Sequence, residues 1–93
     1  MRWVEMIQVR PRMQDRDDAQ KTLEQMAKEL RPISSLHGVL VWTQTDDFGD
    51  FAIILQWDND RQPVKTREGY LLAETMHAFG GLSHTVWNEK QSK

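Results

Sequence analysis

Three polar side chains of the kinds that move protons recur at helical spacing in the segment 67–79. Tyr70, Glu74 and His77 are separated by four and then three residues, so on a helix they form one row. In that row Glu74 would orient His77 and raise its basicity, and His77 would take a proton from a substrate hydroxyl near Tyr70. The same row also fits a solvated helix face with an ordinary Glu–His contact, and the sequence leaves both interpretations open.

The other two histidines stand alone near the ends of expected elements. His37 precedes Gly38, and His84 lies near the start of the last expected strand. A histidine in such a place ordinarily hydrogen-bonds the backbone, although we also count His84 among the candidate substrate-binding residues. No two histidines have the i,i+4 or His-x-His spacing that places two metal ligands on one element. Since the chain also has no cysteine, we expect no metal site.

Tryptophans are numerous for a chain of this length. Trp3, Trp42, Trp57 and Trp87 all fall on segments that we expect to be strands. Such large side chains are typical of a core or a subunit interface. Trp57 and Trp42 are also candidates for the wall of a pocket that holds a planar substrate, together with Phe79 at the end of the second expected helix.

Composition restricts the classes of protein to which the chain can belong. It has 93 residues, of which 39% are hydrophobic and 28% charged, and a formal net charge of −2. This balance is typical of one soluble globular domain over residues 1–93. An acidic chain without a basic stripe is not expected to bind nucleic acid. No apolar run suits a membrane span or a signal peptide, so we expect a cytoplasmic protein.

Hydrophobic periodicity divides the chain into six elements. Proline and glycine mark several of their ends, Thr66 offers an N-cap to the second helix, and Gly80 with Gly81 suggests a left-handed cap after it. The aspartates Asp15, Asp17 and Asp18 are candidate caps for the first helix. The expected elements are a strand at 2–10, a helix at 18–31, strands at 37–45 and 51–57 joined by a hairpin turn at 46–50, a helix at 67–79 and a strand at 83–88.

The order of these elements predicts a ferredoxin-like α+β fold, in which a four-stranded antiparallel sheet carries both helices on one face. The segment 51–57 is apolar at odd and even positions alike, and so is much of the segment 2–10. Strands of this kind are covered on both faces. Because the helices cover one face only, and monomers rarely expose an apolar patch of several hundred Å², we expect a homodimer that packs sheet against sheet.

Three features of the chain together resemble one known family. They are the βαββαβ order, the strand FAIILQW followed by polar DND, and the segment TREGYLLAETMHAFG with HTVW after it. In these features the chain is similar, over nearly its whole length, to the antibiotic biosynthesis monooxygenases of the dimeric α+β barrel superfamily. The resemblance implies a homodimeric barrel with a pocket in each protomer between the sheet and the helices.

Members of that family include cofactor-independent oxygenases of quinols and polycyclic phenols, relatives that degrade haem, and many proteins without a known substrate. The haem-degrading pattern has a Trp early in the second helix, a His farther along it as iron ligand, and an Asn in the first strand. Here Tyr70 stands near the Trp position, His77 comes too soon, and Gln8 replaces the Asn. We therefore expect neither haem nor any other cofactor.

The resemblance implies a cofactor-independent monooxygenase that oxidises a small quinol-like or polyphenol-like aromatic with O2 in that pocket. Deprotonation of the substrate by His77 suits this chemistry, because only the electron-rich phenolate passes an electron to O2. The alternative, from another class of function, is a non-catalytic homodimer of the same fold that binds a small ligand or serves a structural role.

Overall fold

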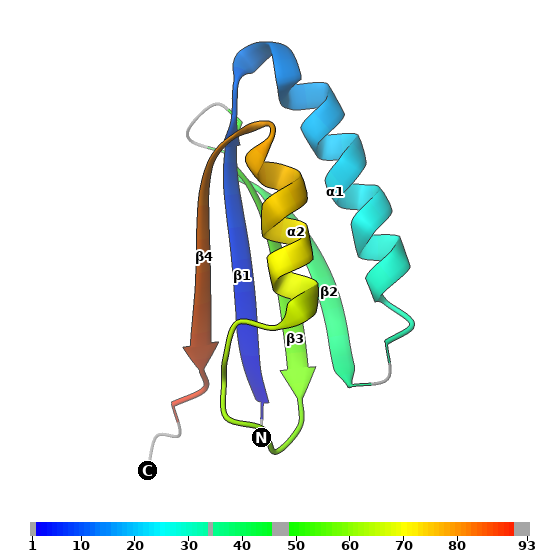
Figure 1. The fold of residues 1–93 in the computed structure, drawn as a ribbon, viewed down its shortest axis with the longest axis vertical. Helices are drawn as coiled ribbons and strands as arrows, with labels where there is room; N and C mark the ends of the chain where they lie inside the picture. Colours follow the sequence, from blue (N-terminus) through cyan, green and yellow to red (C-terminus); the bar gives the residue numbers. More distant parts are fainter. Residues whose placement is uncertain (1, 34, 46–48, 91–93) are drawn as a thin grey trace.

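The computed structural model describes residues 2–33, 35–45 and 49–90. Its elements follow the predicted βαββαβ order, with one 3-10 turn added before the first helix (Figure 1). The elements are β1 (Arg2–Pro11), the 3-10 turn η1 (Met13–Asp15), α1 (Arg16–Leu30), β2 (Leu36–Thr43), β3 (Phe51–Asp58), α2 (Arg67–His77) and β4 (Gly80–Asn88). Residues 46–48 of the predicted hairpin turn lie outside the described residues.

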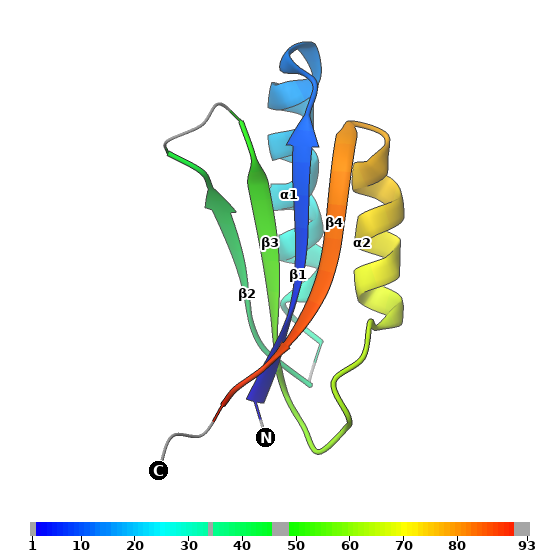
Figure 2. The same ribbon diagram turned by 90° about the vertical axis from the view of Figure 1, so that its left-hand side faces the viewer.

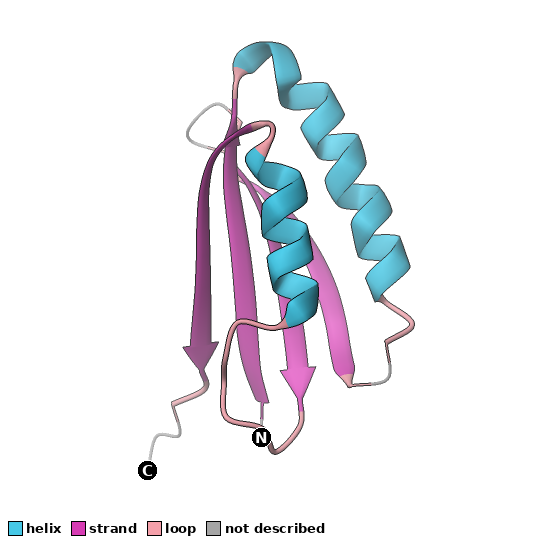
Figure 3. Ribbon diagram, viewed as in Figure 1, coloured by secondary structure: helices cyan, strands magenta, loops and turns pink. Residues whose placement is uncertain are grey.

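The strands form one antiparallel sheet in the order β2-β3-β1-β4. Both helices lie in front of this sheet in Figure 1, and the turned view of Figure 2 shows no helix on its other face. Figure 3, coloured by secondary structure, shows the same two layers. The predicted ferredoxin-like arrangement, with two helices on one face of a four-stranded sheet, is therefore confirmed.

Alternation along β1 and β3 places the odd-numbered residues of both strands under the helices. Trp3 pairs with Trp57 across the two strands, and their rings stack with centroids 5.7 Å apart. From Trp3 to Val9 and from Phe51 to Trp57 every odd-numbered residue of this row is buried, and one of them, Glu5, is charged and 0% exposed. The buried apolar members of the row are Trp3, Ile7 and Val9 from β1 and Phe51, Ile53, Leu55 and Trp57 from β3.

Helix α1 packs on this row with a narrow stripe of small and branched side chains. Ala19, Leu23 and Ala27 are 0% exposed and recur at every fourth residue, which places them on one side of the helix. The helix starts at Arg16, two residues before the expected position. Asp15 occupies the N-cap position but makes no capping bond, because its carboxylate accepts a 2.7 Å hydrogen bond from Arg12 instead.

Helix α2 begins as predicted and ends differently. The Thr66 side chain accepts a hydrogen bond from the Gly69 amide, so the predicted N-cap is confirmed. The predicted left-handed cap is wrong, because Gly80 and Gly81 already belong to β4 and, among the described residues, only Gly49 has a positive φ. A Cβ at Gly80 would overlap the Arg10 carbonyl, so this glycine permits close approach of two strands.

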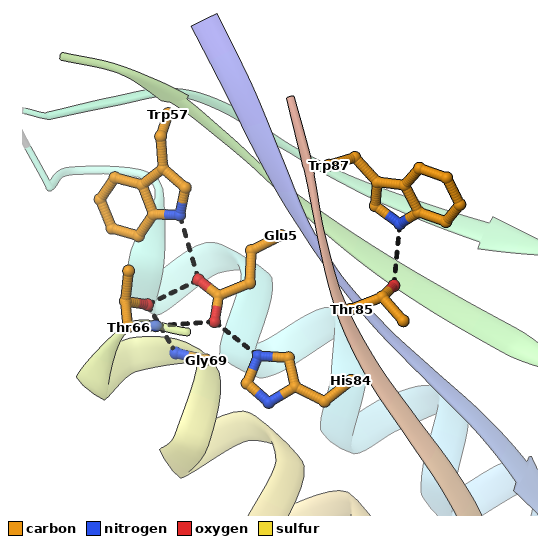
Figure 4. Close-up of polar contacts among 7 residues, drawn as sticks. All are labelled: Glu5, Trp57, Thr66, Gly69, His84, Thr85 and Trp87. Atoms are coloured by element: carbon orange, nitrogen blue, oxygen red, sulfur yellow. Dashed lines mark hydrogen bonds and ion pairs between the residues drawn. The ribbon is translucent and has the colours of Figure 1, made fainter. Parts of the chain in front are cut away.

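The face of the sheet away from the helices carries apolar side chains together with polar ones such as Gln8, Gln56 and Thr85. Ile54 is buried there at 5% exposure, and Trp42 and Trp87 are 58% and 56% exposed. The Trp87 indole donates a 2.8 Å hydrogen bond to Thr85 on the same face, on the far side of β1 from Glu5 (Figure 4). Among the described residues no helix has the length and apolar character needed to cross a membrane.

Candidate functional site

The buried Glu5 carboxylate is the centre of a polar cluster between the sheet and the start of α2 (Figure 4). Its Oε1 accepts hydrogen bonds from the Trp57 indole at 3.1 Å and from the Thr66 hydroxyl at 2.6 Å. Its Oε2 accepts from the Thr66 amide at 2.9 Å and lies 2.5 Å from His84 Nε2. Glu5 therefore joins β1, β3, β4 and the cap of α2 at one point.

These four contacts fix the roles of the groups around Glu5. A carboxylate offers about four lone pairs, and here each is directed at a partner. Thr66 accepts a hydrogen bond from the Gly69 amide, so its hydroxyl proton points to Glu5. Since three donors already surround the carboxylate, the fourth contact is best satisfied when His84 carries its proton on Nε2.

The first turn of α2 is shaped to admit this cluster. A Cβ added at Gly69 would overlap Glu5 Oε2 and lie 2.9 Å from His84 Nε2. The glycine is therefore required for space, because its φ is not positive. On the other side of the ring Tyr70 packs edge-on against His84, with ring centroids 5.4 Å apart. Among the described residues, no group bonds His84 Nδ1.

A hollow of about 340 Å³ lies beside this cluster, where β1 begins and β3 ends. Its walls include Trp3, Trp57 and Thr66, together with residues of the segment 59–68 that leads into α2. Two of these three side chains also contact Glu5. The hollow is thus connected to the buried carboxylate through Trp57 and Thr66, and through Glu5 to His84.

The structure brings together some of the residues that the sequence singled out and separates others. Trp57, His84 and Tyr70 all belong to the Glu5 cluster or contact it. Glu74 and His77 are exposed on α2, and in the described chain no hydrogen bond or ion pair joins them. The helical row of the sequence thus contributes only its first residue to this cluster.

Two other predicted contact residues lie away from the cluster. Trp42 is on the open face of the sheet and lines a separate hollow there of about 220 Å³. Phe79 is partly buried and packs against the core. Neither one lines the hollow beside Glu5.

Sequence reasoning missed Glu5, although the strand pattern contained a signal for it. Glu5 occupies an odd position between Trp3 and Ile7, so its side chain belongs to the buried face of β1. A charged residue in a buried row needs partners. The partners of Glu5 in the structure are a capping threonine and a lone histidine, 61 and 79 residues away in the sequence. Periodicity does not relate positions so far apart.

A second buried acid lies on the open face. Asp50 is 6% exposed and accepts hydrogen bonds from Arg10 at 2.9 and 3.3 Å and from Gln8 at 3.4 Å. The hydrogen bond from the Arg10 guanidinium, aided by its charge, holds the pKa of the Asp50 carboxyl below its ordinary value of 3.8 against the opposing effect of burial. This pair anchors one end of that face. Among the described residues, no three His, Asp or Glu side chains gather as metal ligands would.

Comparison with known proteins supports the fold and leaves the chemistry open. The sequence matches no protein-family model, and no curated protein matches it significantly. Several solved structures match over nearly their whole length.

One is a candidate antibiotic biosynthesis monooxygenase from Deinococcus radiodurans, with a TM-score of 0.75 and 13% identity, covering 98% of this chain and 95% of that one. Another, named simply an antibiotic biosynthesis monooxygenase, has a TM-score of 0.72 and 15% identity over 100% of both chains.

A third is a Bacteroides thetaiotaomicron protein of unknown function, described as a possible oxidoreductase, with a TM-score of 0.74 and 11% identity over 92% of this chain and 95% of that one.

The chain shares the fold of these proteins. The fold therefore agrees with the sequence resemblance to the antibiotic biosynthesis monooxygenases. At 11–15% identity the likeness carries no residue roles. Roles must come from the Glu5 cluster itself.

Proposed function

We propose that the chain is a homodimeric, cofactor-independent monooxygenase that oxidises a small quinol-like or polyphenol-like aromatic with O2. The observation that carries the proposal is the polar chain from the hollow to His84. Thr66 lines the hollow and donates to Glu5 at 2.6 Å, and the other Glu5 oxygen lies 2.5 Å from His84. The fold shared with proteins named monooxygenases supports it.

This chain of groups suits removal of a phenolic proton. A substrate hydroxyl beside Thr66 would pass its proton to the Thr66 hydroxyl while the Thr66 proton moves to Glu5 Oε1, and the proton on His84 Nε2 stays hydrogen-bonded to Glu5 Oε2. Proton transfer along groups already in hydrogen-bond contact needs little rearrangement. The phenolate that results is electron-rich enough to pass an electron to O2.

The overall reaction balances without an external reductant. A phenol and O2 give a quinone and water: one oxygen atom enters the ring and becomes a carbonyl, and the other leaves as water. The phenol supplies every electron that O2 accepts. The protein therefore has to bind the ring, hold O2 beside it and remove the hydroxyl proton.

Oxygen uptake by the chelator-treated protein tests this function. With hydroxynaphthalenes and quinols as substrates, we expect Thr66→Val to lower the rate by roughly a hundredfold, because it removes the hydroxyl from the chain of groups. Thr66→Ser keeps both the hydroxyl and the helix cap and is expected to retain most of the rate. Equal rates for the two variants would contradict the role of Thr66.

The same assay compares the two histidines. The Glu5 cluster predicts that His84→Gln lowers the rate, whereas the helix-face prediction assigns this effect to His77→Gln. Loss of activity in the His77 variant alone would support His77 as the base, in the exposed row with Tyr70 and Glu74, and contradict the role of the Glu5 cluster. Far-ultraviolet circular dichroism of each variant serves as the control for folding.

Dimerisation is supported by the open face of the sheet. Trp42 on the edge strand β2 and Trp87 on the edge strand β4 are more than half exposed on it, and exposed large apolar side chains of this kind are typical of an interface. We expect light scattering to give about twice the chain mass of 11.0 kDa. Trp42→Glu, which places a charge on that face at the edge strand β2, should shift the mass toward that of one chain.

The saturation of Glu5 favours a second function. A carboxylate whose acceptor sites are all filled within the protein also serves as a rigid internal tie, and a hollow beside such a tie suits ligand binding without chemistry. Binding of aromatic compounds without oxygen uptake on any of them would favour this non-catalytic dimer.

A further inference from the structure

The hollow beside Glu5 has an unusual charge for this protein. The chain as a whole carries a net charge of −2, yet Arg61, Lys65 and Arg67 all line the hollow, whereas Glu68 is the only acid among its lining residues. All three cations are exposed at its rim. The rim is therefore locally positive in an acidic protein.

Asp58 and Asp60 near the hollow are engaged with other partners, whereas Glu68 lines it, so that three cations and one acid leave the lining with two net positive charges. Asp58 lies 4.0 Å from Arg2, and Asp60 also has a partner. The Glu5 carboxylate is 0% exposed and its acceptor sites are filled. Within the described chain, none of the three rim cations forms an ion pair, so their charge is available to a ligand.

Trp3 and Trp57 lie at the floor of the hollow, where they are only 2% and 4% exposed. The Trp3 indole donates to Asn59 at 3.0 Å and the Trp57 indole donates to Glu5 at 3.1 Å, so both N–H groups are occupied. The same Asn59 oxygen accepts the Arg61 amide at 3.0 Å. Asn59 thus ties the backbone of one rim cation to the aromatic floor.

We propose that the hollow binds a small aromatic compound that carries a carboxylate group. The ring packs against Val64, which is 52% exposed, and against the edges of Trp3 and Trp57 that reach the hollow. The carboxylate faces Arg61, Lys65 and Arg67. A guanidinium matches a carboxylate with two parallel hydrogen bonds, whereas a lysine acts as a point charge.

The size of the hollow agrees with such a ligand. Its volume of about 340 Å³ is near the lower end of the range for small-molecule sites, which suits a compound of one or two rings. This inference rests on the proposed function and names the class of its substrate: an aromatic acid with a ring hydroxyl. Binding and chemistry remain separable in experiment.

Isothermal titration calorimetry with 2-naphthoate and 2-naphthamide tests the charge preference. The two probes have the same rings and differ in charge. In low-salt buffer at pH 7 we expect the carboxylate to bind about tenfold more tightly, since each exposed ion pair contributes a factor of about two to five. The preference should weaken as salt is added. Equal affinities for the two probes would overturn the proposal.

A matched pair of variants locates the effect. Arg61→Gln with Lys65→Gln and Arg67→Gln removes the three rim cations and should abolish the preference for 2-naphthoate. The control variant removes three exposed cations in and just after α1 instead, through the changes Lys21→Gln, Lys28→Gln and Arg31→Gln. Both variants change the net charge equally. A preference lost equally in both would mean that only the overall charge matters, which would overturn the site.

Nuclear magnetic resonance of the indole N–H groups places the ring. Naphthoate should shift the signals of Trp3 and Trp57 and leave those of Trp42 and Trp87 unchanged, while acetate alone should shift none of them. Shifts confined to Trp42 or Trp87 would place the ligand on the open face and overturn the proposal. Naphthoate itself has no hydroxyl, so this result stands apart from oxygen uptake.

Hydroxynaphthoates then separate the two proposals. Tight binding of a hydroxynaphthoate without oxygen uptake would support the anionic site and contradict the oxygenase. Uptake with neutral naphthols that exceeds uptake with hydroxynaphthoates would support the oxygenase and contradict the anionic substrate.

Discussion

Replacing Glu5 by glutamine tests whether the buried cluster is built as described. The amide keeps the shape of the carboxylate but turns one of its two oxygens into an N–H donor. If that donor takes the Oε2 position it faces the Thr66 amide, and in the Oε1 position it faces the Trp57 indole. The Thr66 hydroxyl can rotate and the His84 ring can change tautomer, but these two N–H groups are fixed donors.

One fixed N–H group is therefore left without an acceptor in either orientation of the introduced amide. An unsatisfied buried donor costs about 1–3 kcal/mol, and the remaining hydrogen bonds lose the strength that a charged acceptor gives them. We expect Glu5→Gln to lower the free energy of unfolding by about 2–4 kcal/mol, a large part of the roughly 5–15 kcal/mol of a typical domain.

Urea unfolding followed by circular dichroism measures this difference, at one protomer concentration because unfolding of the proposed dimer would depend on concentration. Glu24→Gln is the matched control. Glu24 is exposed on α1 and accepts only a 3.2 Å hydrogen bond from Gln20, so its loss should change the stability by less than about 0.5 kcal/mol. A Glu5→Gln variant as stable as this control would refute the hydrogen-bonded cluster.

Three further changes probe other parts of the fold. Gly69→Ala pushes a methyl group into the buried carboxylate, and urea unfolding should show a loss of about 1–3 kcal/mol. Gly80→Ala places a methyl group against the Arg10 carbonyl and should destabilise similarly. Gly81→Ala is its control, because a Cβ there meets nothing within 4 Å. Equal losses of stability in the two variants would contradict the structure. Because the folded-state pKa of Asp50 is lowered, its bonds stabilise above pH 3.8 and are lost as the pH falls below it. The stability difference between wild type and Arg10→Gln should therefore be constant near neutral pH and shrink in acid, and an unchanged difference at pH 3 would contradict this.

The sequence predicted the elements well because their periodicity is local. Alternation in 2–10 and 51–57 and the stripe of α1 each depend on residues a few positions apart. The error at Gly80 and Gly81 has a tertiary cause. Glycine there is required because β4 pairs with the end of β1, and a local rule assigned the pair to a helix cap.

The candidate site was predicted only in part for the same reason. Helical spacing placed Tyr70, Glu74 and His77 on one helix, and all three lie on α2. In the described part of the chain they do not form a hydrogen-bonded cluster. The Glu5–His84 contact joins residues 79 positions apart. Only the pairing of β1 with β4 brings them together, and the sequence pattern does not give the register of that pairing.

The cap of α2 also has a consequence for how the chain folds. This helix has only 11 residues, and helices so short are marginal on their own in water. Its capping residue, Thr66, is held through both its amide and its hydroxyl by Glu5, which lies 61 residues earlier in the chain. The start of α2 is therefore completed only when the first strand is in place. The C-terminal third of the chain depends on the N-terminus for its helix, and the amide hydrogens of Thr66 and Gly69 should exchange with solvent only when the whole domain unfolds.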